Sequence, residues 1–324
     1  MRFILILQKV RKSLKSFQFS NYVVYLSFLI ILAFFSLTLT NKGFLSGDNL
    51  MNILRQTAMV SVMAVGMTFT ITAGEIDLSI GATVALSALV TGVLLRTQNI
   101  AVSVAAGLAI GLVMGFINGI ITTKVRIPAF LVTLGTQSII SGLARTITNL
   151  QTVPITNQTF NYFFGSGDLG PISTLFIWTI AIAFIGHLVL TKMPFGKAVT
   201  ATGGNRSAAR YSGIRTDNIR IAVLVISGVT AALAGILYAG RLNGARYTLG
   251  ETDLLTVIAA VVIGGTAFSG GKGSIIGSII GSIVMGILNN GLLLMGLSVS
   301  EQMIARGIII VIAVSLSLRE ELDR

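Results

Sequence analysis

IAVSVAAGLAIGLVMGFINGIITT, residues 100–123, is an apolar run that contains no charged side chain. A run of about 20 apolar residues is long enough to cross the roughly 30 Å hydrocarbon core of a bilayer as an α-helix. Lipid offers the backbone no hydrogen-bond partner, so an open sheet is excluded and the run is predicted to be helical. The sequence therefore indicates a chain that spans a membrane.

The composition of the whole chain supports the same class. Hydrophobic residues make up 53% of the 324 residues and charged residues only 10%, whereas a soluble globular domain carries about 25% charged residues. The mean hydropathy is +0.89. The 36 glycines suit helices that pack closely in lipid. The expected fold class is an all-α integral membrane protein.

Ten apolar segments can be marked along the chain, of which the eighth is short for a full crossing. They are Tyr22–Leu39, Ile53–Ala73, Ser79–Leu95, Ile100–Thr123, Pro128–Ile147, Ile172–Leu190, Ile221–Gly240, Leu254–Phe268, Ser274–Leu297 and Met303–Leu318. They predict about ten transmembrane helices in a single transmembrane domain, residues 22–318. A basic N-terminal segment, 1–21, and a short tail, 319–324, would flank this domain on the cytoplasmic side.

The distribution of positive charge predicts the orientation of these helices. If the N-terminus is cytoplasmic, most of the 23 Lys and Arg residues fall in cytoplasmic loops, as the positive-inside rule requires. Both termini are then cytoplasmic. The polar stretch Thr148–Pro171 falls outside, and the basic stretch Thr191–Arg220 falls inside. The inner stretch is either an orientation signal or a docking surface.

The sequence also excludes several kinds of site. It has no Cys, which rules out disulfides, thiol nucleophiles and Cys-based metal sites. Its one His, His187, has no nearby carboxylate with which to bind Zn²⁺. The net charge of +12 is spread over loops and forms no basic stripe interleaved with aromatic residues, so no nucleic acid partner is expected. No metal is expected either.

A glycine-rich segment, Gly264–Ser274, invites comparison with a phosphate-binding loop. The comparison fails because Thr266 stands where the loop needs Gly, and Gly273 stands where it needs Ser or Thr after the lysine. We therefore expect no ATP site and no cofactor in this chain, and we interpret the segment as a tight turn between two helices.

Two acids lie between the second and third apolar segments, in Gly74-Glu-Ile-Asp-Leu-Ser79. Ionisable groups at membrane depth are costly, and they usually line a water-filled path or pair internally. A lining or gating role is the favoured interpretation of Glu75. Asp77 and Ser79 either belong to the same path or cap the first free N–H groups of the third helix.

A second candidate part of the path is Pro128-Ala-Phe-Leu-Val-Thr-Leu-Gly135. Pro128 suits a first helical turn, where its missing N–H group costs nothing. If this helix stops part-way into the membrane, its free N–H groups would face a polar solute; otherwise it is an ordinary helix start. Pro128, Phe130 and Thr133 are therefore candidate path or gate residues.

Small residues recur every four positions in the stretch that begins at Gly273 and continues through Gly277 and Gly281. Such a repeat is typical of a helix face that packs closely against another helix. The sequence leaves open whether that other helix belongs to this chain or to a second copy.

The basic inner stretch contains a short predicted helix between Asn205 and Ile214. Asn205 is a good N-cap, and Gly213 would end the helix. Two interpretations remain open. A soluble motor would grip such a helix, or Arg206 and Arg210 would lie on lipid headgroups at the membrane surface.

These motifs together resemble the ribose-type permeases of ABC importers, a branch that also serves xylose, galactose, inositol, fructose and autoinducer-2. The resemblance runs from about Asn49 to Leu318. Its motifs are Gly74–Gly81, Pro128–Gly135, Phe195–Asn205, Ala208–Ile214 and Gly264–Ser274. It implies a type II ABC importer-like permease of the bacterial inner membrane that moves a small sugar inward, with ribose or a related monosaccharide favoured. The family usually has a second Gly where this chain has Glu75.

The resemblance also implies partners. Residues 205–214 would be the coupling helix that docks on a cytoplasmic ATPase subunit, and the ATP would bind to that subunit. A second permease chain, identical or a related paralogue, would enclose the path within the lipid bilayer, and a periplasmic solute-binding protein would deliver the solute. The small side chains of Ala208 and Ala209 would suit close insertion. The implied coupling residues are Asn205, Arg206, Ala208, Ala209, Arg210, Ser212, Gly213 and Ile214.

Two alternatives belong to other classes. An ion-coupled secondary transporter would carry a buried acid inside a span and inverted repeats, whereas the acids here cluster at loops and no clear inverted repeat is visible. An intramembrane enzyme would require a catalytic set of residues, and no such set is found in the sequence.

Overall fold

The computed structural model of the chain describes residues 20–298, 300–309 and 311, and most of them are helical. The helices are α2 (Ser20–Thr38), η1 (Thr40–Lys42), α3 (Gly47–Thr72), α4 (Ile80–Leu94), α5 (Ile100–Ile120), η2 (Ile121–Val125), α6 (Ala129–Thr148), α7 (Gln158–Asn161), η3 (Tyr162–Ser166), α8 (Thr174–Lys192), α9 (Pro194–Gly204), α10 (Arg206–Tyr211), α11 (Thr216–Arg241), α12 (Asp253–Ile263) and α13 (Ile275–Leu294). A further helix covers residues 300–309.

Four short strands complete the described elements. β1 (Val153–Pro154) pairs with β4 (Gly244–Ala245), and β2 (Asp168–Leu169) pairs with β3 (Ile172–Ser173), both in antiparallel orientation. The β1–β4 pair joins two loops that the charge distribution places on the same side of the membrane. The long polar stretch before α8 is thus ordered by pairing with the loop that follows α11.

Within the described ranges, five helices are long and apolar enough to cross a membrane: α3, α5 with η2, α8, α11 and α13. The predicted spans Ser79–Leu95 and Leu254–Phe268 form shorter apolar helices, α4 and α12. The structure therefore supports an all-α membrane protein in which five of the described helices are both long and apolar enough to cross the bilayer, and the count of about ten stays a prediction. The last predicted span, Met303–Leu318, and the N-terminal segment 1–21 lie partly outside the described residues, and the tail 319–324 lies wholly outside them.

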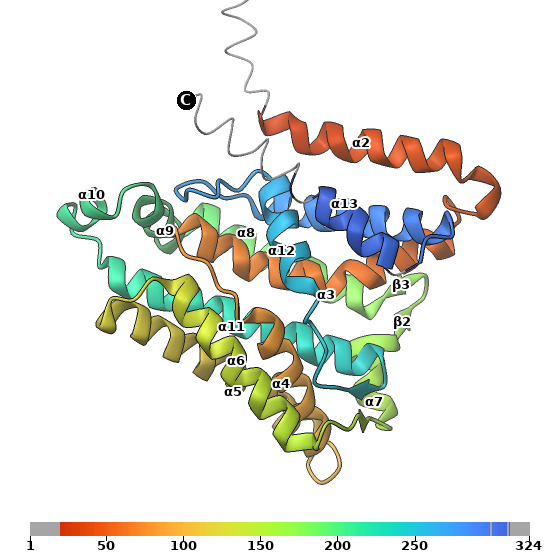
Figure 1. Cartoon of the computed structure of the whole chain (residues 1–324), viewed down its shortest axis with the longest axis horizontal. Helices are drawn as coiled ribbons and strands as arrows, with labels where there is room; N and C mark the ends of the chain where they lie inside the picture. Colours follow the sequence, from red (N-terminus) through yellow and green to blue (C-terminus); the bar gives the residue numbers. More distant parts are fainter. Residues whose placement is uncertain (1–19, 299, 310, 312–324) are drawn as a thin grey trace, which may run out of the picture.

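α3 and α11 form the centre of the molecule. α11 packs against α3, α4 and α5, while α3 also packs against α8 and α13. α2 lies across the outer side of α13 (Figure 1). Fewer than a third of the residues of α5 and α8 are buried in their most apolar stretches, as expected of helices that face lipid or another chain.

Glycines bring the central helices close together. A Cβ atom on Gly111 of α5 would overlap the carbonyl group of Gly228 on α11, and a Cβ atom on Gly228 would overlap that of Gly111. Only small residues permit such an approach, and close approach gives extensive van der Waals contact between helices in lipid. This contact fixes α5, and with it η2, against α11.

The small residues in and just before α13 pack against two helices, α12 and α3. A Cβ atom on Gly277 or Gly281 would overlap backbone carbonyls of α12 and the residue that follows it, and one on Gly273 would overlap the hydroxyl of Thr72 on α3. The intervening serines face α3, where Ser278 Oγ lies 2.7 Å from Thr68 Oγ1 and Ser282 Oγ lies 2.5 Å from Ser61 Oγ. The repeat therefore makes contacts within this chain.

The loops separate into two sets, as the predicted alternation of spans requires. Residues 73–79, 193–216 and 264–274 meet at one end, where Gly271 N–H donates to the carbonyl of Thr72 over 2.9 Å. The β1–β4 pair and the ion pair of Arg55 with Asp168, 2.6 Å long, lie at the other end. Figure 1 shows α9 and α10 at one end of the molecule and α7 with β2 and β3 at the other.

Candidate functional site

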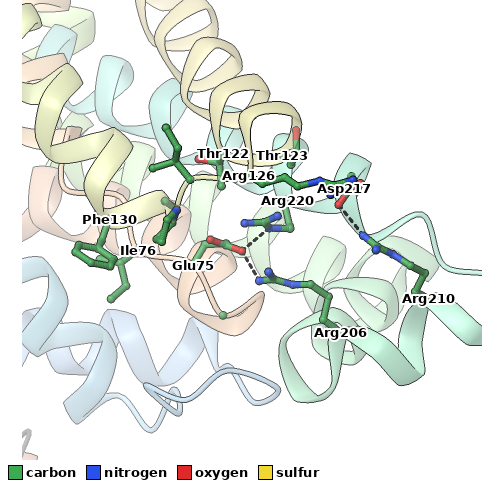
Figure 2. Close-up of a pocket in the computed structure, with 14 residues that line it drawn as sticks. Glu75, Ile76, Thr122, Thr123, Arg126, Phe130, Arg206, Arg210, Asp217 and Arg220 are labelled. Atoms are coloured by element: carbon green, nitrogen blue, oxygen red, sulfur yellow. Dashed lines mark hydrogen bonds and ion pairs between the residues drawn. The ribbon is translucent and has the colours of Figure 1, made fainter.

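A polar cavity of about 610 Å³ opens at the end of the molecule that carries α10. Five segments line it: residues 74–76 after α3, residues 122–123 of η2, residues 126–130 at the start of α6, two positions on α10 and two on α11. Figure 2 shows the side chains of these segments around the same space. The cavity therefore gathers residues from three motifs that sequence analysis considered separately, at 74–79, 128–135 and 205–214.

Glu75 lies in the wall of this cavity and is buried, with 5% of its surface exposed. Its Oε1 atom accepts hydrogen bonds from Arg206 of α10 and from Arg220 of α11, each 2.5 Å long (Figure 2). Arg220 is also buried, whereas 41% of the Arg206 side chain is exposed. A buried carboxylate is costly unless it is paired, and here two guanidinium groups share it. Glu75 thus connects three elements.

The backbone around Gly74 explains how Glu75 reaches this position. Gly74 follows α3 with φ of +76°, a conformation that L side chains rarely adopt. The Glu75 N–H group donates to the carbonyl of Thr70 over 2.9 Å, which turns the chain sharply after the last helical turn. Gly270, in the glycine-rich turn, packs against Gly74, so that turn supports the loop from behind.

Asp77 and Ser79 lie deeper, both buried. Asp77 Oδ1 accepts hydrogen bonds from the N–H group of Ser79, over 2.9 Å, and from its hydroxyl, over 2.6 Å. Asn118 of α5 donates to Ser79 Oγ over 3.0 Å. Ser79 occupies the N-cap position of α4, but its side chain accepts no hydrogen bond from that helix. The predicted side-chain cap is therefore replaced by a buried polar network that joins this loop to α5.

The start of α6 supplies the third part of the candidate site. Pro128 precedes the first residue of α6 and lines the cavity, as does the half-exposed Phe130. Thr133 lies behind them, buried, and its hydroxyl accepts a hydrogen bond from Leu78 N–H over 3.0 Å. Glu75, Pro128 and Phe130 thus border the cavity, while Asp77, Ser79 and Thr133 hold its wall together.

α10 forms where the sequence predicts a short helix. The side chain of Asn205 accepts a hydrogen bond from Ala208 N–H over 2.9 Å, and Gly213, with φ of +86°, follows the last turn. Ile214 N–H then donates to the carbonyl of Ala209 over 3.0 Å. Local capping therefore fixes both ends of a helix that is only six residues long.

The two alanines of α10 face opposite ways. Ala209 is buried against its own chain, with 4% of its surface exposed, so the expectation that it inserts into another protein is wrong. Ala208 is exposed, as are Ser212 and the first residue, Arg206. Tyr211 is 93% exposed, which leaves a large aromatic ring in solvent. The outward face of α10 and its C-terminal end thus includes Ser207, Ala208, Tyr211 and Ser212.

A second ion pair lies beside the cavity. Arg210 Nη2 is 3.0 Å from Asp217 Oδ1, and both side chains are substantially exposed. This pair joins α10 to the first turn of α11. Together with the Arg206–Glu75 pair, it holds α10 at both of its ends.

Sequence reasoning missed several residues of this site. Arg220 lies directly before the apolar run Ile221–Gly240, and a cation at the edge of such a run usually pairs with an acid. Glu75, on the same side of the membrane, was the available acid. Asn118 lies in an otherwise apolar run and was not singled out. The sequence does not reveal that Tyr211 is exposed, because its exposure depends on how α10 packs against the rest of the chain.

The described residues hold no group of three His, Cys, Asp or Glu side chains that could bind a metal ion. The charged side chains around the cavity are mainly arginines, which do not bind metals. The arrangement can bind anions or polar solutes and can transmit force between α10 and the loop after α3.

The sequence of the chain is similar to those of known membrane permeases. The profile of the family described as "Branched-chain amino acid transport system / permease component" matches residues 49–314. The ribose import permease protein RbsC of Bacillus subtilis is 40% identical over 287 residues, which cover 87% of this chain and 88% of that protein. The probable ABC transporter permease protein YphD of Escherichia coli is 39% identical, over 93% of this chain and 91% of that protein.

A more distant relative is the xylose transport system permease protein XylH of Escherichia coli, 30% identical over 93% of this chain and 92% of that protein. No solved structure matches the chain. The family profile covers all of the segments that line the cavity, from the loop after α3 to the start of α11. The chain therefore belongs to the family of membrane permease components described as "Branched-chain amino acid transport system / permease component".

Proposed function

We propose that this chain is the membrane-spanning subunit of a bacterial ATP-driven importer that moves ribose or a related monosaccharide into the cell. The names of its relatives support the substrate class, since they include ribose, D-allose and xylose permeases. Their match over nearly the whole chain supports the role of a permease subunit.

The observation that carries this proposal is the position of α10. Its outward face exposes Tyr211 almost completely, and its first residue, Arg206, is ion-paired with the buried Glu75. Exposed aromatic side chains are often the residues that contribute most to binding at protein interfaces. An ATPase subunit that gripped the outward face of α10 would thus pull directly on the loop after α3.

The remaining partners follow from the same role. ATP binds to the ATPase subunit, and both termini of this chain lie in the cytoplasm with α10. A second permease chain, identical or a paralogue, completes the path, and a periplasmic solute-binding protein delivers the sugar. The exposed side chains of α6, among them Leu134, Ile139 and Leu143, face lipid or that second chain.

The path passes close to the cavity. The cytoplasmic side of the path is bordered by Glu75, Pro128 and Phe130, which line the cavity. The position of the loop between α3 and α4 is fixed by Asp77, Ser79 and Thr133. Movement of α10 would shift Glu75 first, because the ion pair is the shortest connection between α10 and that loop.

Reconstitution tests the proposal. The chain is placed in proteoliposomes with a candidate ATPase and a candidate solute-binding protein from the same genome, and uptake of radiolabelled ribose and xylose is measured with internal ATP. Uptake should need all three proteins, should stop when the ATPase is inactivated by mutation of its catalytic Glu, and should persist in the presence of a protonophore. Uptake that persists without ATP and collapses with the proton gradient would instead indicate an ion-coupled secondary transporter.

A further inference from the structure

The cavity beside Glu75 carries more positive than negative charge. Four arginines line it, Arg126, Arg206, Arg210 and Arg220, against two acids, Glu75 and Asp217. Glu75 is shared by two of the arginines, and Asp217 pairs with a third. The other lining residues are neutral. The cavity therefore has a surplus of two positive charges that the protein itself does not neutralise.

Arg126 is the arginine that remains. It is exposed, it lines the cavity, and it makes no ion pair or hydrogen bond with any residue in the part of the chain that the structure describes. Its backbone is left-handed, with φ of 64°, because the chain turns there between η2 and α6. This turn places a free guanidinium group at the cavity.

Thr122 provides an independent indication that the cavity receives a polar ligand. Its side chain is fully buried and lines the cavity, and its hydroxyl has no hydrogen-bond partner among the described residues. A buried polar group without a partner costs about 1–3 kcal/mol. A ligand oxygen that reached this hydroxyl, through a small shift of the cavity wall, would supply the missing partner.

We propose that this cavity binds a phosphate group, most simply that of a small cytoplasmic phosphate monoester. A phosphate monoester carries close to two negative charges at neutral pH because its second pKa is about 6, which matches the surplus of two positive charges. The planar guanidinium groups of arginine fit phosphate oxygens in pairs. The volume of about 610 Å³ leaves room for a sugar attached to the phosphate.

Binding would also compete with an existing contact. A phosphate between Arg126 and Arg206 would take over part of the positive charge that now faces Glu75. It would thereby loosen the ion pair that anchors α10. This inference goes beyond the proposed transport function, and its test measures binding alone, so it stands or fails separately from transport.

The test uses the full chain in nanodiscs of phosphatidylcholine. Binding of inorganic phosphate, of a hexose monophosphate and of the same hexose without phosphate is measured by isothermal titration calorimetry. Both phosphates should bind, the neutral sugar should not bind at this site, and the affinity should fall as salt is added.

Three variants locate the site. Arg126→Asn keeps a residue that tolerates the left-handed backbone and should weaken phosphate binding at least about tenfold, the usual cost of losing a charged hydrogen bond. Glu75→Gln should strengthen binding, because it removes the competing carboxylate. Arg145→Asn is the matched control, since Arg145 is an exposed arginine that pairs with Glu251 away from the cavity, and its binding should equal that of the unmodified chain.

A second arm identifies the source of the phosphate. Nanodiscs that also contain phosphatidylglycerol are examined by native mass spectrometry for retained lipid. Retention that is lost in Arg126→Asn, with no binding of the free phosphates, would assign the site to a lipid headgroup. If neither free phosphates nor phosphatidylglycerol respond to Arg126→Asn and Glu75→Gln, the proposal is wrong.

Discussion

The carboxylate of Glu75 lies 2.5 Å from a guanidinium nitrogen of Arg206, so the loop that follows α3 is bonded to the first residue of α10. Arg220 of α11 approaches the same carboxylate oxygen at the same distance. The loop after α3 therefore meets α10 and α11, which lie more than 130 residues further along the chain, at one carboxylate oxygen. Each of the following predictions probes that junction or the packing and orientation that support it.

Glu75→Gln should destabilise the chain by about 2–4 kcal/mol, because it leaves the buried Arg220 without a counter-charge. The measurement is the free energy of unfolding in a mild detergent. Glu75→Gln combined with Arg220→Met should recover much of the loss, since the unpaired charge is then gone. Asp217→Asn, which breaks the exposed pair with Arg210, should change stability by less than about 1 kcal/mol. Equal losses for the Glu75 and Asp217 variants would contradict the importance of burial.

Tyr211→Ala should weaken binding of the ATPase subunit, because it removes the most exposed aromatic ring of α10. Ala208→Trp should do the same by blocking close approach. Loss of a central aromatic at an interface typically costs about 2 kcal/mol or more. Co-purification and sugar uptake report the effect, while the level of the chain in the membrane should not change.

Ala209→Trp distinguishes the two faces of α10. Ala209 is buried within its own chain, so this variant should lower the stability of the permease itself, which Ala208→Trp should not do. If Ala208→Trp and Tyr211→Ala import sugar at the normal rate with the ATPase still bound, α10 is not the coupling helix.

Gly277→Ala should destabilise the chain by about 1–3 kcal/mol, because the new Cβ atom would overlap the backbone of Gly264. Gly142→Ala is the matched control. It also lies within a helix, nothing lies within 4 Å of its added Cβ atom, and alanine favours helix over glycine by about 1 kcal/mol. Thermal unfolding in detergent should separate the two substitutions in opposite directions. The same loss for both would mean that the α12–α13 contact is loose.

Single cysteines test the orientation directly, since the chain contains no Cys of its own. Thr159 and Ser207 are both exposed and lie at opposite ends of the molecule. In intact cells a membrane-impermeant maleimide should label Thr159→Cys but not Ser207→Cys, and permeabilisation should expose the second. The reverse pattern would overturn the assignment of both termini to the cytoplasm.

Most of the helices could be predicted because apolar runs and capping residues are local signals. α13 begins one residue after the predicted start at Ser274, and Asn205 caps α10 as expected. The number of full spans was harder to predict, because apolarity alone does not reveal that α4 and α12 are only 15 and 11 residues long. α12 ends where Gly264 and Gly265 turn the chain, inside the predicted span Leu254–Phe268.

The candidate site was predicted in parts but not as a whole. Glu75 was recognised as unusual because a carboxylate is costly near a membrane. Its partners were not, since Arg206 and Arg220 are more than 130 residues away in the chain and only the packing of α11 against α3 brings them together. Likewise the inward direction of Ala209 depends on how α10 lies on its neighbours, which local sequence does not encode.

α11 connects the two ends of the molecule. It is 26 residues long, or about 39 Å at the rise of an α-helix. Near its first turn Arg220 holds Glu75. At its last turn Gly240 is packed on the backbone of Gly165, and Arg241 donates to the carbonyl of Arg55 over 3.2 Å.

If α11 tilts as a rigid rod, it acts as a lever arm. A tilt of about 5° about its first turn would carry its far end by about 3 Å, given its length, and the segment around Gly165 would travel with it. In that motion the two ends of α11 would move together, and a small displacement near Glu75 would become a larger one near Gly165.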